Sequence, residues 1–301
     1  MSGGAVIDVD DKLLRAWPLP EADGDADKED RGRVLIVAGS REVPGAAVLA
    51  GVAALRAGAG KLVVATPQSV WALVAAALPE ARVIALPESA RGGPTLEGLE
   101  LLRGCAESTA AVLVGPGMMD GETTARFTEQ LMPLFARSAI VLDALAMDAV
   151  RTMHQPEGRQ VLLTPHAGEM AHLSGIAKEE VQRDAMEVAR RQARAWNAMV
   201  ALKGPVTCIA RPDGRTWRHE GGCAGLATSG SGDVLAGLIA GLAARGAPLE
   251  QAAAWGVALH ARAGTRLARD MGPLGFLARE LAAQVPPLMR ELGPAEPPAS
   301  R

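Results

Sequence analysis

The sequence predicts an α/β protein built on a doubly wound, mostly parallel sheet with helices on both faces. Short β-branched runs alternate with longer helical stretches along most of the chain, a pattern typical of parallel sheets covered by helices. No repeat, linker or low-complexity block interrupts the alternation, which favours one compact domain. Hydrophobic residues make up 49% of the chain and charged residues 22%, values typical of soluble globular proteins.

The first half of the chain contains four apolar runs with the composition of buried strands. Val and Ile are frequent in these runs, and their branched side chains fit a pleated, buried surface. Between them lie Ala- and Leu-rich stretches of helical length, the first of which opens after Pro44-Gly45. The expected strands are 34–38, 62–66, 82–86 and 111–114, and the expected helices are 46–57, 69–78, 95–105 and 123–135.

The second half continues the alternation and adds an antiparallel pair. Pro212-Asp213-Gly214 supplies the residue types that tight turns need, so we expect a β-hairpin around it. The expected strands are 139–142, 161–163 and 199–202, and the expected helices are 178–196, 233–244 and 249–269.

Composition also divides the chain into a domain and two peripheral segments. Residues 21–33 mix six acidic with three basic residues, so 1–30 is expected to be a surface lead-in segment. The ending 293–301 is rich in Pro and is expected to be a flexible tail. The α/β domain then covers 31–292.

Charge and cysteine content exclude several classes of partner. A formal charge of −3 predicts neither nucleic-acid nor anionic-membrane binding. The beginning of the chain lacks the pattern of a signal peptide, and the longest apolar runs are about half the ~20 residues that cross a bilayer. The three cysteines are scattered without a CxxC pair, which indicates neither a disulfide framework nor a zinc site. We therefore expect a cytoplasmic protein.

Ligands of doubly wound sheets bind beyond the carboxyl ends of the strands, so the residues that follow each strand are informative. Gly39-Ser40 and Gly115-Pro116-Gly117 each follow a strand, and both patterns fit a ligand-facing backbone or an ordinary tight turn. Lys203-Gly204 also follows a strand, and the lysine fits either an anion-binding site or an ordinary solvated surface. In Thr164-Pro165-His166-Ala167-Gly168-Glu169 we favour a ligand-binding His166 over an N-terminal cap formed by Thr164 and Glu169.

Gly230-Ser231-Gly232-Asp233 gives the strongest signal in the sequence. This turn leads into an apolar helix, where free N–H groups and the helix dipole form an anion hole. Asp233 would repel a phosphate placed directly upon it, but it is well placed as a base for a hydroxyl that attacks phosphorus. The alternative is a capping role for Asp233. No GxxxxGK[ST] pattern accompanies the turn, so it is not a P-loop.

Five segments follow one another along the chain: VLIVAGSREVPGAAVLAGVAALRAGAGKLVVATP, VLVGPGM, LLTPHAGEM, ALKGPVTCIARPDG and GLATSGSGDVLAGLIAGLAARG. Together and in this order they resemble the ADP-dependent NAD(P)H-hydrate dehydratases, a branch of the ribokinase-like fold. The resemblance runs from about residue 32 to about residue 290. GSGD alone indicates a ribokinase-like enzyme, whereas GSxxxPGAA, GPG and TPHxGE together are specific to the dehydratases.

The resemblance implies a hydro-lyase that repairs nicotinamide cofactors. Such an enzyme dehydrates the S epimer of NADH hydrate (NADHX) or NADPH hydrate (NADPHX) and converts ADP to AMP and phosphate. It further implies Mg²⁺, a homo-oligomer such as a tetramer, and a separate epimerase in the cell, since the residues before the first strand are too few for an epimerase domain.

The family's functional residues transfer onto matching positions of this chain. The resemblance makes Asp233 the catalytic base, which also contacts substrate, and Gly230, Ser231 and Gly232 the anion hole. The remaining matched positions are Ala46, Gly117 and His166 for the hydrate, and Lys203, Gly204, Pro205, Val206, Thr207 and Gly232 for the adenine nucleotide. The metal ligands are not assigned.

This chain departs from the family pattern at three motifs. Where the family often has DADAL, the sequence reads Asp143-Ala144-Leu145-Ala146-Met147, so a second aspartate is missing. GPGLG is replaced by GPGMM, and an Asn-rich stretch before GSGD by GGCAG. Two other functions remain open on the residues alone: a ribokinase-like kinase of a small hydroxylated metabolite or vitamin precursor, and a non-enzymatic nucleotide sensor, which would tolerate loss of Asp233.

Overall fold

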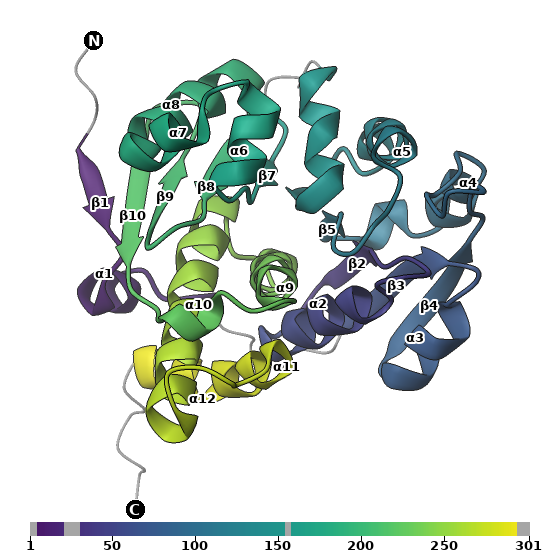
Figure 1. Ribbon diagram of the computed structural model, residues 1–301. Helices are drawn as coiled ribbons and strands as arrows, with labels where there is room; N and C mark the ends of the chain where they lie inside the picture. The colour runs from purple at the N-terminus through teal and green to yellow at the C-terminus, as the bar shows by residue number, and fades with distance from the viewer. Residues whose placement is uncertain (1–4, 21–30, 154–157, 294–301) are drawn as a thin grey trace, which may run out of the picture.

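The computed structural model describes residues 5–20, 31–153 and 158–293. Its strands form one sheet in the order β1-β10-β9-β8-β7-β6-β5-β2-β3-β4 (Figure 1). Strand β9 is antiparallel to both of its neighbours, and every other adjacent pair is parallel. The strands are β1 (Val6–Asp8), β2 (Arg33–Val37), β3 (Lys61–Pro67), β4 (Ala81–Leu86), β5 (Ala111–Val114), β6 (Ala139–Leu142), β7 (Val161–Leu163), β8 (Met199–Leu202), β9 (Val206–Ala210) and β10 (Thr216–Glu220).

Helices connect most of these strands. The α-helices are α1 (Asp11–Ala16), α2 (Gly45–Arg56), α3 (Trp71–Ala77), α4 (Gly98–Arg103), α5 (Gly121–Leu134), α6 (Ala167–Ser174), α7 (Lys178–Arg183), α8 (Ala185–Trp196), α9 (Ser231–Ala244), α10 (Leu249–Met271), α11 (Ala278–Leu281) and α12 (Val285–Leu292). Short 3₁₀ helices are η1 (Ala106–Ser108), η2 (Ala144–Arg151), η3 (Ala224–Leu226) and η4 (Ala282–Gln284). The predicted α/β fold with a mostly parallel sheet is confirmed.

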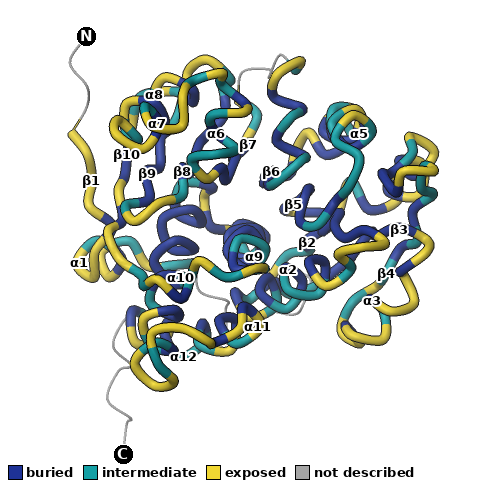
Figure 2. The backbone as a smooth tube through the Cα atoms, in the orientation of Figure 1, coloured by how far each residue is buried: buried dark blue, intermediate teal, exposed yellow. Residues whose placement is uncertain are grey.

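Alternation along the strands supplies a core on each face of the sheet. In β2, Val34 and Ile36 belong to one buried cluster with α2, α9 and α10, whereas Leu35 and Val37 belong to a second cluster with α4 and α5. A third cluster joins β8 and β9 to α6, α7 and α8. Buried residues fill the centre of the molecule and exposed residues lie at its periphery (Figure 2). The helices therefore cover both faces, as doubly wound topology requires.

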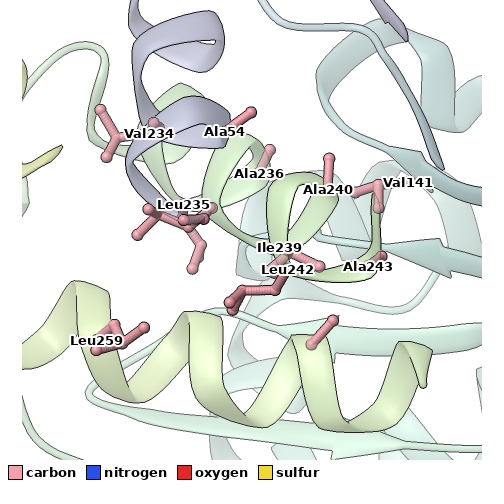
Figure 3. Close-up of a cluster of buried hydrophobic side chains, with 14 of the residues drawn as sticks. Ala54, Val141, Val234, Leu235, Ala236, Ile239, Ala240, Leu242, Ala243 and Leu259 are labelled. Atoms are coloured by element: carbon pink, nitrogen blue, oxygen red, sulfur yellow. The ribbon is translucent and has the colours of Figure 1, made fainter. Parts of the chain in front are cut away.

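Helix α9 lies at the centre of the fold and is almost entirely buried. Figure 3 shows its apolar side chains between Ala54 of α2, Val141 of β6 and Leu259 of α10. On the side that faces α2, Gly237 and Gly241 carry no side chain. A Cβ at either glycine would lie 2.4 Å from a backbone oxygen, that of Ala50 or Ala54. The two helices are thus in backbone contact, which a larger residue at these positions prevents.

The predicted helix over 178–196 is two helices. Asp184 ends α7 and precedes α8, with backbone angles of φ −120° and ψ 37°. Aspartate is a poor helix former because its short carboxylate competes for nearby hydrogen bonds, and here it accepts one from Arg183 Nε at 3.0 Å. The helix predicted over 95–105 is shorter, Gly98–Arg103, with a 3₁₀ turn after it.

The predicted surface lead-in needs correction where it is described. Residues 5–20 belong to the fold, because β1 pairs with β10 and Leu14 is fully buried. Trp17 stacks on Trp217 at a centroid distance of 6.3 Å, and its carbonyl accepts from Trp255 Nε1 at 2.9 Å. The lead-in was predicted from the charged residues of 21–33, and that charge pattern carries no information on the apolar packing of Trp17. The rest of the predicted lead-in, and nearly all of the predicted tail over 293–301, lie outside the described residues.

The predicted hairpin around Pro212-Asp213-Gly214 is confirmed. Strands β9 and β10 pair antiparallel across it, and the Gly214 N–H donates to the Arg211 carbonyl at 3.0 Å. Within the described ranges, no helix combines the length and the apolar character needed to cross a membrane.

Gly237→Ala should destabilise the protein, because its new Cβ would lie 2.4 Å from the Ala50 carbonyl oxygen. Overpacking of this kind costs about 1–3 kcal/mol. Urea unfolding should show a lower midpoint with little change in slope. Gly104→Ala is the matched control, since a Cβ there meets nothing within 4 Å. Equal midpoints for the two variants would contradict the close approach of α2 and α9.

Candidate active site

Polar side chains meet where β6, β7 and β8 end. Asp143 follows β6, Thr164 follows β7 and Lys203 follows β8. Lys203 Nζ lies 3.1 Å from Asp143 Oδ1, and the Thr164 hydroxyl donates to the same oxygen at 2.6 Å. The Lys203 N–H donates to the Pro165 carbonyl at 2.8 Å, so the chains run side by side beyond the strands. The site is therefore at the carboxyl edge of the sheet.

The GSGD turn forms the N-terminus of α9. Gly230 is the N-cap residue with φ +86°, where a Cβ would also lie 2.5 Å from Leu49 Cδ1. The Ser231 N–H donates to the Thr228 carbonyl at 3.2 Å, so this member of the predicted anion hole is already used. In the described part of the chain, the N–H groups of Gly230, Gly232 and Asp233 have no hydrogen-bond partner. The donors available to an anion are therefore these three.

Asp233 lies in the first turn of α9, but it does not cap the helix. Gly230 holds the N-cap position, and no side chain of the described residues caps this N-terminus. None of the described residues donates a hydrogen bond to the Asp233 carboxylate. Burial raises the pKa of Asp233 to about 6; the charge of Asp143 adds to the rise and that of Lys203 opposes it. A carboxylate with this pKa is largely ionised at neutral pH and is a stronger base than ordinary aspartate.

Lys203 links the sheet edge to the helix. Its ammonium lies 3.7 Å from Glu169 Oε2 as well as beside Asp143, and a Cβ at Gly232 would lie 3.6 Å from it. Burial favours the neutral amine, but the surrounding carboxylates, chiefly Asp143 and Glu169, outweigh burial and raise the pKa of Lys203 above its ordinary value. A permanent positive charge therefore sits at the N-terminus of α9.

His166 is both an N-cap and a candidate ligand. Its Nδ1 accepts from the N–H groups of Gly168 and Glu169 at 3.0 and 3.1 Å, and Glu169 accepts from the His166 N–H at 2.8 Å. The N-cap is His166 itself and not Thr164, which had been the alternative to a ligand-binding His166. Because Nδ1 accepts, the neutral ring carries its proton on Nε2, which can donate to a ligand. The side chain is 60% exposed.

A cavity of about 330 Å³ adjoins His166 between η2 and α6. Leu145 and Leu173 line it together with His172, whose Nε2 lies 2.9 Å from Asp148 Oδ1. Sequence patterns gave His172 no role, because neither spacing nor motif connects it to Asp148. Leu145 stands where the family often has its second aspartate, and its side chain makes this wall of the cavity apolar.

Ala46 and Gly117 are brought together at the start of α2. Gly117 has φ +63°, and a Cβ on it would lie 2.5 Å from the Ala46 Cβ and 2.8 Å from the Val43 carbonyl oxygen. Only glycine fits this contact without displacing backbone. The turn thus needs Gly117 for packing, whether or not a ligand also binds there.

The predicted nucleotide stretch is the connection from β8 to β9. Gly204 and Pro205 are exposed, Val206 is half-buried and Thr207 is buried. This connection begins at Lys203, so it shares the sheet edge with Asp143 and the start of α9. Its exposed backbone leaves room for a ligand against the turn.

Sequence reasoning did not assign a role to two residues that contact the site. They are Asp143, which contacts Lys203, and His260, which contacts Ser231. Asp143 directly follows a strand, a signal that could have identified it, and it is only 4% exposed. His260 of α10 lies 2.9 Å from Ser231 Oγ, and no sequence spacing relates the two residues. Among the described residues, no group of three or more His, Cys, Asp and Glu side chains could by itself hold a metal ion.

A basic residue, a buried carboxylate and free N–H groups at one helix N-terminus define an enzyme-like anion site on a doubly wound α/β fold. The sequence profile of the NAD(P)H-hydrate dehydratases matches residues 34–287. The chain belongs to this family.

Individual relatives agree with the profile. The chain is 47% identical to the ADP-dependent (S)-NAD(P)H-hydrate dehydratase of Xanthomonas campestris, covering 97% of this chain and 99% of that protein. It is 38% identical to the bifunctional NAD(P)H-hydrate repair enzyme Nnr of Moorella thermoacetica, covering 93% of this chain and 54% of that protein.

Solved structures agree on the fold. A crystal structure of the ADP/ATP-dependent NAD(P)H-hydrate dehydratase of Bacillus subtilis, co-crystallized with ATP and Mg²⁺, is 30% identical with a TM-score of 0.81, covering 96% of this chain and 99% of that chain. A ribokinase-like superfamily protein of Enterococcus faecalis is 25% identical with a TM-score of 0.84, covering 97% and 98%. The predicted ribokinase-like fold is confirmed.

Asp143→Asn should lower the pKa of Asp233 from about 6 toward the ordinary value of 3.8. The variant removes a neighbouring negative charge and frees Lys203 to face Asp233, and both changes favour the ionised carboxylate. Asp233 would then ionise at lower pH, while burial keeps part of the rise. Infrared difference titration against Asp233→Asn measures this directly. Asp148→Asn is the control, and an unmoved midpoint in Asp143→Asn would contradict the coupling.

Proposed function

We propose that this protein dehydrates the S epimer of NADH hydrate and NADPH hydrate with ADP as phosphoryl donor, restoring NADH or NADPH and forming AMP and phosphate. The carrying observation is Asp233, a buried carboxylate without a hydrogen-bond donor among the described residues, beside free N–H groups at the start of α9. The 47% identical Xanthomonas protein bears the name of this activity.

The chemistry requires a phosphoryl intermediate because hydroxide is a poor leaving group. Transfer of the β-phosphoryl group of ADP to the ring hydroxyl at C6 forms a phosphate ester and releases AMP. The C6–O bond then breaks, phosphate leaves with the bonding electrons, and a proton is lost from C5. This restores the ring double bond, and the sum is hydrate plus ADP giving reduced cofactor, AMP and phosphate.

The positions of the residues support a proposed role for each of them. Asp233 accepts the proton of the C6 hydroxyl as the oxygen attacks phosphorus. The N–H groups of Gly230 and Gly232 hold the oxygens of the transferring group, where negative charge is greatest. Lys203 supplies positive charge at the same point.

The two ligands occupy opposite sides of this centre. The nucleotide lies along 203–207, with its phosphates directed at the start of α9. The nicotinamide end of the hydrate lies between the anion hole and His166, near Ala46 and Gly117. Only this order brings the C6 hydroxyl to Asp233 in line with the β-phosphoryl group.

The donor set fits a magnesium ion that arrives with the nucleotide. Asp143, Glu169 and Asp233 outnumber Lys203, so the charges of ADP would add to an already negative site. Mg²⁺ usually binds through one or two carboxylates together with substrate phosphates and waters, so a dedicated protein cage is not required. When bound, the ion would offset this repulsion, and Asp143 would be its neighbouring carboxylate.

The wider setting is also part of the proposal. Three free cysteines, of which Cys105 and Cys208 are buried, suit the reducing cytoplasm. A homo-oligomer such as a tetramer would cover exposed apolar side chains such as Leu73 and Leu274. A separate epimerase would supply the S epimer from the R epimer.

The decisive experiment follows the near-ultraviolet absorbance of reduced nicotinamide after hydrated cofactor is mixed with protein, ADP and magnesium. Absorbance should return, and AMP and phosphate should form in equal amounts. Parallel reactions with each hydrate, and with ATP in place of ADP, define the preference. No recovery with either hydrate and either nucleotide would reject the proposal and favour the kinase of a small hydroxylated metabolite.

Asp233→Asn should lower kcat by about 10²–10⁴, because the amide keeps the shape but cannot accept the hydroxyl proton. Nucleotide binding by calorimetry should stay near the wild-type value. Asp270→Asn, an exposed aspartate paired with Arg269, is the control. If Asp233→Asn keeps more than half of the wild-type rate, the assignment of the base is wrong.

Lys203→Ala should weaken ADP binding more than hydrate binding, because the lysine begins the nucleotide stretch and adjoins Gly232. Calorimetry with each ligand separately measures the difference. Lys178→Ala, at the start of α7, is the control. Equal losses for both ligands would indicate that Lys203 only holds Asp143 and Glu169 in place.

A further inference from the structure

His260, a histidine that belongs to none of the sequence motifs, contacts Ser231 in the turn that forms the anion hole. His260 projects from α10 to the first turn of α9, where its Nε2 lies 2.9 Å from Ser231 Oγ and 3.0 Å from the Ser231 carbonyl oxygen. A carbonyl oxygen can only accept, so Nε2 carries the proton and donates. Both Ser231 oxygens therefore share one donor.

The contact matters because of the geometry of the peptide group. The Ser231 carbonyl and the Gly232 N–H are the two ends of one planar, trans unit, so they point in opposite directions. The helix orients this peptide group, and a further donor on its carbonyl restricts the direction of the N–H and polarises it. That N–H has no partner among the described residues, and a Cβ on Gly232 would lie 3.6 Å from Lys203 Nζ. It therefore faces the site.

The imidazole is neutral, as this arrangement requires. Burial lowers the pKa of His260 to about 4; the Ser231 carbonyl opposes the fall and the charge of Lys203 adds to it. At neutral pH the ring holds a single proton, and the carbonyl keeps that proton on Nε2. His260 thus donates without bringing a second positive charge to the site.

We propose that His260 is a positioning residue for phosphoryl transfer: by donating to the Ser231 carbonyl it aims the Gly232 N–H at the transferring phosphoryl group. This inference rests on the proposed function.

Packing alone does not require a histidine at this position. The neighbouring contact of α9 with α10 is apolar: a Cβ on Gly256 would lie 2.6 Å from Ile239 Cγ1, and Leu259 is fully buried. A leucine at position 260 would continue this contact while removing the donor. The helices can therefore stay together when the hydrogen bond is lost, which makes the role testable.

The kinetic test compares His260→Leu with His260→Gln under saturating hydrate and ADP. Loss of an oxyanion-hole donor costs about 10²–10³ in kcat, and misdirection of a donor that remains should cost about 10- to 100-fold. We expect that fall in kcat for His260→Leu, with KM for both substrates within about twofold. His260→Gln should recover most of the rate, because its amide can also donate to the carbonyl.

One further variant separates positioning from stability. His219→Leu removes a buried histidine that hydrogen-bonds a backbone carbonyl, that of Val9 at 2.8 Å, and should lower stability without changing kcat. Wild-type kcat in a folded His260→Leu, or equal impairment of His260→Leu and His260→Gln, would overturn the proposal.

A measurement independent of turnover keeps the inference separate from the proposed function. Labelling Ser carbonyls with ¹³C and Gly amides with ¹⁵N makes only the four Ser-Gly pairs of the sequence visible together in carbonyl–amide NMR spectra. The Ser231–Gly232 signal should move in His260→Leu and stay in place in His219→Leu. An unmoved signal overturns the inference, whereas absent turnover with a moved signal rejects only the proposed reaction.

Discussion

Backbone contact between α2 and α9 is the constraint on which the site depends. Gly237 and Gly241 allow α9 to approach Ala50 and Ala54 so closely that a single added carbon would strike a carbonyl oxygen. Each helix begins at the site: α2 opens beside Gly117, and α9 opens with the GSGD turn. Fixing the helices against each other therefore fixes the turn at Gly117 relative to the GSGD turn. The small residues of these helices form the Ala- and Gly-rich runs of the sequence, and they allow this close helix–helix packing.

Electrostatics then sets what the assembled site can do. Lys203 is surrounded by carboxylates and holds Asp143 in place, yet it leaves Asp233 without a hydrogen-bond donor among the described residues. Asp233 is consequently a base whose proton affinity reflects burial and a neighbouring negative charge. The free N–H groups of the same turn provide the compensating dipole. One helix start thus offers both a proton acceptor and an oxyanion site, and these are separated by less than one helical turn.

The parts of this structure that depend on local composition could be predicted, and the parts that depend on tertiary contact could not. The parallel strands and the GSGD helix are strong local patterns, because β-branched runs and a Gly-rich turn keep their meaning in most contexts. The break at Asp184 involves a hydrogen bond from Arg183 Nε, and the cap by His166 involves two, from the N–H groups of Gly168 and Glu169. The place of β1 depends on a partner more than two hundred residues away. His260 was missed for the same reason, since only the packing of α10 on α9 brings it to Ser231.

The stacked indoles of Trp17 and Trp217 have an optical consequence. Their planes are 17° from parallel, and they lie far apart in the sequence: Trp17 follows α1, and Trp217 lies in β10. The chain has no tyrosine and five tryptophans, so its near-ultraviolet signal comes almost wholly from indole. The strong far-ultraviolet transitions of two indoles with ring centroids 6.3 Å apart couple as an exciton pair, which gives a circular-dichroism band of paired sign. That band reports attachment of the amino-terminal segment to the sheet separately from the melting of the central core.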